Sequence, residues 1–353
     1  MRSKRLSLLV ALLLAVPMMA KAAETRPWRI YLLFGQSNMT GGATPGPEDV
    51  FNNPRVKVLA YNNCSGRTYN QWYLATGFLH CSNGFGIGDW FGKIVADSLK
   101  QDTIALIPCA IAGVDIDFFR KDIVSGRRGD FQIPPDNHWA GAYPWMLERL
   151  KKAQEKGVIS GILLHQGEAD WTAVAQKVWP DKVAGIITDL KKDLGFDDVP
   201  VLIGELRADS KACCGGNNAF VAEAAKTVPN GHVISSSALT VNDDPYHFDG
   251  PGLREFGKRY AASYLQAIKT SSSATRPGVY SPAHWHMREV SGARTLEFNQ
   301  AQDRILIRDS EGRRIAEGSG RAMRLPNSGK HGLLFFQAAA GTEISSGTLL
   351  DLP

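Results

Sequence analysis

The sequence predicts a three-layer α/β/α domain with a doubly wound parallel sheet, followed by a small all-β module. Three observations indicate this fold class. Short apolar runs alternate with stretches of helical periodicity, the apolar runs are almost continuous, and the pattern changes to short strands near the C-terminus. Strands that are apolar on both faces are typical of a parallel sheet covered by helices on both sides. A chain of 353 residues is long enough for one large and one small domain.

The expected strands are runs rich in aliphatic and β-branched residues, at positions 29–34, 56–60, 103–107, 158–165, 201–204 and 232–236. The expected helices lie between them and after them, at 88–99, 143–156, 180–193, 219–227 and 253–268. In the third of these helices, Pro180 suits the first position, where its missing N–H costs nothing. The last helix is clearly amphipathic, because apolar residues recur every three or four positions.

A polar run at 271–278 is typical of a linker, so we expect the large domain to cover residues 23–270. Beyond the linker, residues 279–353 favour short strands at 295–299, 304–308, 314–316 and 333–337. The sequence Asp309-Ser310-Glu311-Gly312 predicts a hairpin turn between two of them. The pattern indicates a small β module and leaves its role open.

The first residues predict a secretory signal peptide. Arg2, Lys4 and Arg5 precede an apolar run at 6–16, and the small-residue pattern Ala20-Lys21-Ala22 follows. We therefore expect residues 1–22 to be cleaved after Ala22 and the protein to be secreted or periplasmic. The apolar run is too short to span a bilayer, and charges, glycines or prolines interrupt every later one, so no membrane span is expected.

The charge balance argues against a nucleic-acid partner. The chain has 40 Lys+Arg and 35 Asp+Glu, and the predicted leader takes four basic residues and no acidic one, which leaves 36 against 35. A near-neutral protein without a basic stripe is a poor candidate for binding nucleic acid. The hydrophobic content of 44% is typical of a packed globular protein.

The leader contains none of the five cysteines, which are Cys64, Cys81, Cys109, Cys213 and Cys214. An oxidising compartment permits disulfides, and an odd number leaves one thiol over. Cys109 closely follows an apolar run, so we expect it to be a buried free thiol. Cys64 with Cys81 is the simplest pair, whereas a bridge between the neighbours Cys213 and Cys214 would be strained, so their pairing stays open. The spacings match no zinc ligand pattern well.

The first chemical motif is Gly35-Gln36-Ser37-Asn38-Met39, directly after the first predicted strand. In an open α/β sheet, ligands bind at the carboxyl ends of the strands. A serine in a tight turn at that point presents its hydroxyl to the site, and its own N–H can face a developing oxyanion. Ser37 is therefore a candidate nucleophile. The alternative is that it merely caps the helix that follows.

The second motif lies in the loop before the last predicted helix of the large domain, where Asp244 and His247 are three residues apart. A serine needs a base to become a useful nucleophile, and the base needs an orienting partner. Asp244 can hold one ring nitrogen of His247 and leave the other free to face the serine. The alternative is a solvated loop in which Asp249 caps the helix and His247 has no special role.

The third motif, His165-Gln166-Gly167-Glu168-Ala169-Asp170, ends another predicted strand. Gln166 could donate a hydrogen bond to an oxyanion, and Glu168 could support the base or contact substrate. A metal site built from His165, Glu168 and Asp170 is chemically possible, although no second cluster with helical ligand spacing exists, and a structural role is expected for His165. Gly113, at the end of a further strand, could point its N–H into the site or be a plain turn glycine.

Together, GQSNM, the glycine after IPCAIAG, HQGE and the DxxH spacing resemble the SGNH-type esterase superfamily over about residues 28–268. The likeness is closest to carbohydrate esterase family 6, the acetylxylan esterases, with sialate O-acetylesterases as relatives. The resemblance implies a Ser-His-Asp mechanism with Ser37 as nucleophile, His247 as general base and then acid, and Asp244 as its orienting partner. It also implies an oxyanion hole made by the N–H groups of Ser37 and Gly113 and the side chain of Gln166.

The resemblance further implies that no metal or organic cofactor is needed. The expected function is hydrolysis of O-acetyl groups on carbohydrate, with an acetylated polysaccharide or oligosaccharide, most of all xylan, as substrate. The alternatives are a sialate O-acetylesterase, a metal-dependent hydrolase centred on the HQGEAD segment, or a non-catalytic carbohydrate-binding protein on the same fold. Whether Glu168 assists or replaces Asp244 as the acidic partner stays open, as do the sugar and the oligomeric state.

Overall fold

The computed structural model describes residues 26–353, apart from 65, 82–83, 124–132, 136–140, 197, 210, 275–284, 291–292, 310–313, 326–331, 341–342 and 352–353. Two compact units make up the chain, with the boundary between Lys269 and Thr270. The predicted signal peptide, residues 1–22, lies outside the described residues.

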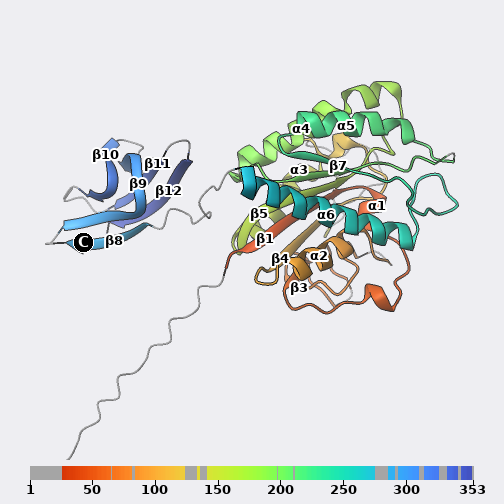
Figure 1. Cartoon of the computed structure of the whole chain (residues 1–353), viewed down its shortest axis with the longest axis horizontal. Coiled ribbons are helices and arrows are strands. Elements are labelled where there is room, and N and C mark those ends of the chain that lie inside the picture. Colours follow the sequence, from red (N-terminus) through yellow and green to blue (C-terminus); the bar gives the residue numbers. More distant parts are fainter. Residues whose placement is uncertain are drawn as a thin grey trace, which may run out of the picture. The chain divides into compact units, whose positions relative to one another are not determined.

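The larger unit is built on a seven-stranded sheet with the strand order β3-β2-β4-β1-β5-β6-β7 (Figure 1). The strands are β1 Trp28–Gly35, β2 Val56–Leu59, β3 Trp72–Leu74, β4 Ile104–Ala110, β5 Gly157–His165, β6 Val201–Gly204 and β7 Gly231–Ile234. Every neighbouring pair is parallel except β2 and the edge strand β3. The predicted parallel sheet is confirmed. The sequence missed β3 because it is only three residues long and half-buried.

Helices cover both faces of this sheet, which confirms the predicted three layers. They are α1 Ser37–Thr40, α2 Ile87–Ser98, α3 Ala142–Gln154, α4 Ala173–Leu194, α5 Asn218–Thr227 and α6 Gly250–Ala274, with 3₁₀ turns at Pro47–Asp49, Ile116–Phe119 and Gly215–Asn217. Helices α2 and α6 pack on one face, and α3, α4 and α5 pack on the other (Figure 1).

The central strand β1 shows why an almost continuous apolar run is required. Its side chains alternate between the two layers, so that Ile30 and Leu32 pack towards α3, α4 and α5, whereas Tyr31 and Leu33 pack towards α2 and α6. All four are fully buried. Each such side chain contributes roughly 1.5–3 kcal/mol of hydrophobic stabilisation relative to exposure. Because β1 is buried on both faces, it fixes the position of the turn that follows it.

Two predicted helix limits were wrong. Helix α4 begins at Ala173, so Pro180 lies inside it rather than at its first position. The start is set by Thr172, whose hydroxyl accepts a hydrogen bond from the N–H of Ala175, a cap that offsets the loss of the proline N–H. Helix α6 extends to Ala274, so residues 271–274 of the predicted linker are helical.

The smaller unit contains a five-stranded antiparallel sheet, as predicted for the C-terminal module. Its strands are β8 Trp285–Val290, β9 Ala293–Asp309, β10 Arg314–Arg324, β11 Gly332–Ala340 and β12 Glu343–Asp351. The two strands expected at 295–299 and 304–308 are one long strand, β9, whose pairing with β10 shifts register along its length. Most of the predicted turn that starts at Asp309 lies outside the described residues.

Two disulfides and one free thiol account for the cysteines. Cys64 is bonded to Cys81, the pair that was simplest from the sequence, and the neighbours Cys213 and Cys214, whose pairing the sequence left open, are bonded to each other. Cys109 is a buried free thiol, as predicted. Burial raises the pKa of Cys109 to about 11, so its sulfur stays protonated and unreactive at neutral pH.

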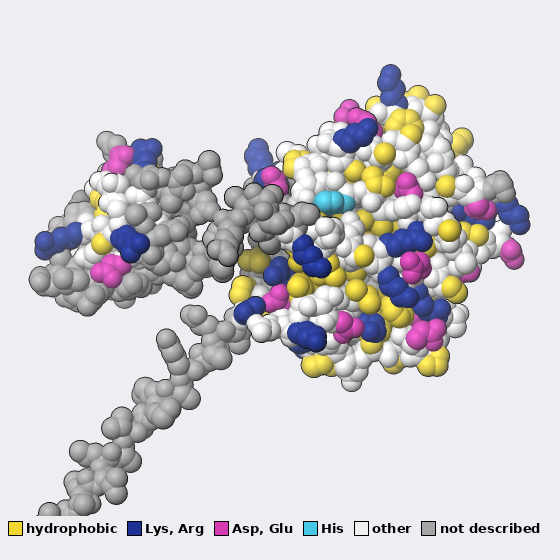
Figure 2. All heavy atoms as spheres, viewed as in Figure 1, with side chains coloured by type: hydrophobic (Ala, Val, Ile, Leu, Met, Phe, Trp, Pro, Cys, Tyr) yellow, Lys and Arg dark blue, Asp and Glu magenta, His cyan; other side chains and the backbone are white. Residues whose placement is uncertain are grey.

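The surface of the larger unit carries mixed charge. On the face shown in Figure 2, Lys and Arg side chains are interspersed with Asp and Glu side chains. This pattern agrees with the near-neutral balance expected after removal of the leader. No helix within the described ranges combines the length and the apolar character needed to cross a bilayer.

Candidate active site

The structure brings Ser37, His247 and Asp244 together at the carboxyl edge of the sheet. Ser37 follows β1, and the other two lie in the loop between β7 and α6. The ring nitrogen Nε2 of His247 is 2.8 Å from Oγ of Ser37, and Nδ1 is 3.0 Å from Oδ1 of Asp244. The His247 and Asp244 side chains are 38% and 40% exposed, so the site opens to solvent. This row of hydrogen bonds is the arrangement that serine hydrolysis requires.

The turn that presents Ser37 depends on Gly35. Gly35 has a φ of +129°, and a Cβ at this position would lie 2.0 Å from the carbonyl oxygen of His165. A glycine is therefore needed for β1 and β5 to end so close together. The N–H of Gln36 then donates to the same carbonyl oxygen over 2.9 Å. Ser37 begins the short helix α1 directly above the sheet edge as a result.

Asn38 ties the serine turn to the histidine loop. Its side chain is buried, and its Nδ2 donates to the carbonyl oxygen of Tyr246 over 3.1 Å and to Oε1 of Glu168 over 2.9 Å. Its Oδ1 accepts from the N–H of Phe248 over 3.2 Å. The residues on both sides of His247 are thus fixed to the neighbour of Ser37. Sequence reasoning gave Asn38 no role, although its place beside the serine was a usable signal.

Hydrogen bonds hold Asp244 in its ionised form. Burial raises its pKa, but the N–H groups of Tyr246 and His247, at 2.8 and 2.9 Å from Oδ1, and the His247 ring outweigh that effect and keep the pKa below its ordinary value. An ionised Asp244 favours the tautomer of His247 with the proton on Nδ1, which leaves Nε2 as an acceptor for the Ser37 hydroxyl. The buried Arg207 side chain also donates to the carbonyl oxygen of Asp244 and so braces the loop.

The predicted oxyanion role of the Gln166 side chain was wrong. Gln166 is fully buried, and its Nε2 donates to Oδ2 of Asp170 over 2.6 Å, with Oε1 of Gln36 and the carbonyl oxygen of Val114 each at 3.2 Å. Its Oε1 accepts from Nε1 of Trp179 over 2.6 Å. The two amide protons are therefore already used inside the protein. The side chain turns towards α4, a direction that depends on packing against a helix remote in the sequence.

Gln36, the residue directly before Ser37, has a second side-chain amide at this edge of the sheet. Its side chain is only 4% exposed, and its Oε1 accepts from Nε2 of Gln166 over 3.2 Å and from the N–H groups of Gly167 and Ala169, each over 3.4 Å. Because two of these donors are backbone N–H groups, the oxygen end must face them, and the Nε2 end points away. Within the described part of the chain, Nε2 of Gln36 makes no hydrogen bond.

Two backbone N–H groups, those of Gly113 and Ser37, are also candidate donors. Gly113 is exposed in the turn after β4, with a φ of +76° that favours glycine. Neither its N–H nor that of Ser37 donates to another of the residues that the structure describes. Unused N–H donors are one requirement of an oxyanion hole, so both groups remain candidates for that role.

Glu168 is a buried residue that does not contact His247. Its side chain is buried, and the structure shows no hydrogen bond between it and His247, whose Nδ1 contacts Asp244 instead. Oε1 of Glu168 accepts from Asn38, while Oε2 is buried without a hydrogen-bond partner in the described residues. Of the two candidate acids, Asp244 is the one that contacts the base.

The side chains considered for a metal site have other partners. Nε2 of His165 is 3.2 Å from the carbonyl oxygen of Glu205, and Asp170 accepts from Gln166 and from the N–H of Ile116. Burial lowers the pKa of His165, so the ring is neutral. Among the residues with described positions, no group of three His, Cys, Asp or Glu side chains is arranged to hold a metal ion.

Comparison with known proteins matches the chain to one family model and to several solved structures. The model of the family described as carbohydrate esterase, sialic acid-specific acetylesterase, matches residues 27–266. A solved protein of Arabidopsis thaliana is 21% identical, with a TM-score of 0.55, over 68% of this chain and 98% of its own. The solved structure of NanS is 15% identical, with a TM-score of 0.55, over 69% of this chain and 99% of its own. At these identities, the two structures support the fold.

Proposed function

The chain belongs to the carbohydrate esterase family of sialic acid-specific acetylesterases, and on that premise we propose that it is a serine esterase that removes O-acetyl groups from xylan. The family match confirms the resemblance to carbohydrate acetylesterases, and the matched residues 27–266 include all four motifs. The observation that carries the proposed chemistry is the hydrogen-bonded row of Ser37, His247 and Asp244 at the edge of the sheet.

In the proposed mechanism, Oγ of Ser37 attacks the acetyl carbonyl carbon while Nε2 of His247 takes the hydroxyl proton. The tetrahedral intermediate collapses, and the protonated His247 gives its proton to the departing sugar oxygen. Ser37 is left acetylated. His247 then takes a proton from a water molecule that attacks the acetyl group, and acetate leaves as Ser37 recovers its proton. Asp244 stays ionised throughout and stabilises the charged imidazole.

The negative charge on the carbonyl oxygen is stabilised by the N–H groups of Ser37 and Gly113 and by Nε2 of Gln36. Gln36 takes the place that the sequence assigned to Gln166. A single donor of this kind contributes about 3–4 kcal/mol in comparable enzymes, because it is held in place before charge develops.

Replacing Gln36 with glutamate is expected to lower kcat for acetate release by about 10²–10³-fold. Glutamate keeps an oxygen for the N–H groups of Gly167 and Ala169 but presents a second oxygen where the donor was. The check is steady-state kinetics together with the thermal midpoint of unfolding, with Gln101→Glu as a matched control, because Gln101 is exposed and precedes β4. A Gln36→Glu enzyme with wild-type kcat would remove Gln36 from the oxyanion hole.

Xylan is proposed because the HQGE motif is more similar to that of acetylxylan esterases than to that of sialate O-acetylesterases. The family description and the likeness to NanS favour an O-acetylated sialic acid as the second candidate. Acetate release from both substrates, measured after exhaustive chelation, separates the alternatives. We expect release from xylan to be faster and to survive chelation. Acetate release from the sialic acid alone would overturn xylan as the substrate but leave the serine chemistry in place. Loss of activity on chelation would favour a metal-dependent hydrolase. No acetate release from either substrate or from an aryl acetate would favour a carbohydrate-binding protein.

We also propose that the protein is exported, with residues 1–22 as its signal peptide and residues 23–270 as its catalytic domain. The β module at 279–353 is proposed to attach the enzyme to a surface or to carbohydrate. N-terminal sequencing of the exported protein should begin at Ala23, and a start at Met1 would contradict cleavage. A chain truncated after Thr270 that binds insoluble xylan as well as the full chain would contradict a carbohydrate-binding module.

A further inference from the structure

Two exposed aromatic side chains lie in the loops that carry the candidate site motifs. Among the large hydrophobic side chains that are exposed in the described residues, only Trp171 and Tyr246 are aromatic, at 69% and 43% exposed. Tyr246 directly precedes His247, and Trp171 directly follows the HQGEAD motif. Aromatic side chains left in water carry large apolar surfaces that a bound partner can cover.

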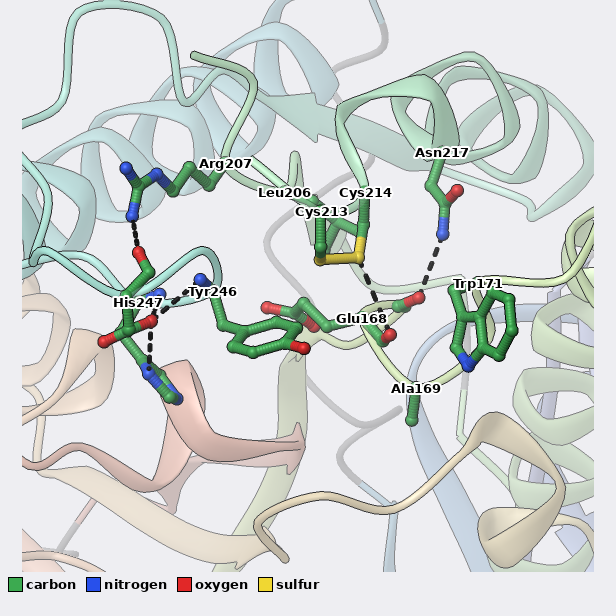
Figure 3. The surroundings of a disulfide bond; sticks show 12 residues. Glu168, Ala169, Trp171, Leu206, Arg207, Cys213, Cys214, Asn217, Tyr246 and His247 are labelled. Carbon is green, nitrogen blue, oxygen red and sulfur yellow. Dashed lines mark hydrogen bonds and ion pairs between the residues drawn. A yellow bond between two sulfur atoms is a disulfide. The ribbon is translucent and has the colours of Figure 1, made fainter. Parts of the chain in front are cut away.

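The Cys213–Cys214 disulfide lies between these two aromatics in the close-up of Figure 3. Cys213 is exposed and Cys214 is buried. The N–H of Cys213 donates to the carbonyl oxygen of Pro245 over 3.2 Å, which attaches the disulfide to the histidine loop. Sγ of Cys214 lies 3.6 Å from the carbonyl oxygen of Glu168 in the loop after β5, a packing contact because a disulfide sulfur has no proton to donate.

A further contact fixes the position of the disulfide segment. Nδ2 of Asn217 donates to the carbonyl oxygen of Gly167 over 2.9 Å (Figure 3). The segment 213–217 is therefore bonded to both loops that carry the exposed aromatics. A bridge between neighbouring cysteines closes a small ring, so the exposed Cys213 side of the disulfide has little freedom and presents a fixed, polarisable and apolar surface.

We propose that Tyr246, the Cys213–Cys214 disulfide and Trp171 form a carbohydrate subsite that holds sugar rings next to Ser37. One face of a pyranose ring presents C–H groups, and its hydroxyls point outwards from the rim. Aromatic rings and sulfur atoms can cover the C–H face, whereas the hydroxyls stay hydrated. The subsite rests on the proposed function for its class of ligand, because the sugar that bears the acetyl group must reach Ser37.

The position of the subsite decides which rings it holds. Tyr246 adjoins the base, so the ring that carries the acetyl group is expected over Tyr246. The disulfide and Trp171 then hold the next ring of an oligosaccharide. A small aryl acetate needs Ser37 and His247 but has no second ring to place on Trp171. The ratio of activity on the two kinds of substrate therefore reports on the subsite.

The first test compares kcat/KM for acetate release from acetylated xylo-oligosaccharides with kcat/KM for an aryl acetate, using the full-length protein. Trp171→Ala is expected to lower the ratio of the two values by about five- to tenfold, mainly through a higher KM for the sugar. Trp171→Phe, which keeps an aromatic face, should recover most of it. Val158→Ala is the control, because Val158 is exposed near the opposite end of β5.

The second test addresses the disulfide. Replacing Cys213 and Cys214 together with alanine leaves no new free thiol, and we expect the same ratio to fall in this double variant. The thermal midpoint of unfolding separates loss of the surface from loss of the fold. An unchanged ratio in the double variant, with a folded protein, would remove the disulfide from the subsite.

A binding measurement tests the subsite without catalysis. Calorimetric titration of acetylated xylo-oligosaccharide, and separately of an O-acetylated sialyl-oligosaccharide, compares Ser37→Ala with Ser37→Ala/Trp171→Ala. Weaker binding of either sugar to the double variant supports the subsite even if the wild-type protein proves inactive. The subsite would be overturned if each sugar bound equally well to the two variants. It would also be overturned if Trp171→Ala lowered kcat/KM for the sugar and for the aryl acetate by the same factor. Failure of the proposed chemistry appears separately, as absence of acetate release by the wild-type protein.

Discussion

Ser37→Ala is expected to lower kcat for acetate release by about 10⁴–10⁶-fold, the largest effect of any single side chain in this protein. Without the hydroxyl, no acetyl-enzyme can form, and only the donors of the oxyanion hole remain to assist water. The measurement is acetate release from acetylated xylan and from an aryl acetate, with circular dichroism to show that the variant is folded.

Ser98→Ala is the matched control for this loss, because Ser98 is exposed at the end of α2 and takes no part in the site. It should keep wild-type activity. A Ser37→Ala protein that retains a substantial fraction of the wild-type rate would show that the hydroxyl is not the nucleophile. The arrangement of Ser37 and His247 would then need a different explanation.

Asp244→Asn is expected to lower kcat by about 10³–10⁴-fold. The asparagine amide has nearly the same shape, but it cannot favour the proton on Nδ1 of His247 or stabilise the imidazolium. Glu168→Gln should cost far less, because Glu168 contacts Asn38 rather than the histidine. Kinetics of the two variants side by side decide which acid serves the base. A larger loss in Glu168→Gln than in Asp244→Asn would reverse the assignment.

The residues that the sequence located well are those whose chemistry is confined to short motifs. Ser37 comes directly after an almost fully apolar strand, and Asp244 and His247 share one loop, so local spacing alone brings an acid within reach of a base. What the sequence could not supply was the distance across the sheet between Ser37 and His247. That distance is set by Asn38, which is bonded to the residues on both sides of the histidine.

Gln166 shows that a sequence motif does not determine the direction of a side chain. A side chain at the end of a strand can turn outwards to the site or inwards to a helix, and its neighbours in sequence do not decide which. Here Trp179 on α4 and Asp170 draw the amide of Gln166 inwards. The same limit applies to β9, where one long strand with shifted register looks in sequence like two short ones.

The fold class was predictable because it depends on patterns that persist along the whole chain. Six apolar runs gave the parallel strands, and the change of period after the last long helix indicated the β module. Helix limits were less predictable, as the start of α4 shows, because the cap at Thr172 outweighs the preference of Pro180 for a first position. Local capping chemistry competes with residue preference, and the outcome depends on both.

Covalent trapping tests the central claim most directly. The full-length protein is treated with a serine-directed organophosphonate, digested, and its peptides are mapped by mass spectrometry. The geometry predicts one adduct, on the hydroxyl of Ser37, whose formation slows strongly in His247→Ala because the base is missing. An adduct confined to another residue, or undiminished acetate release from protein that is fully modified at Ser37, would contradict Ser37 as the nucleophile.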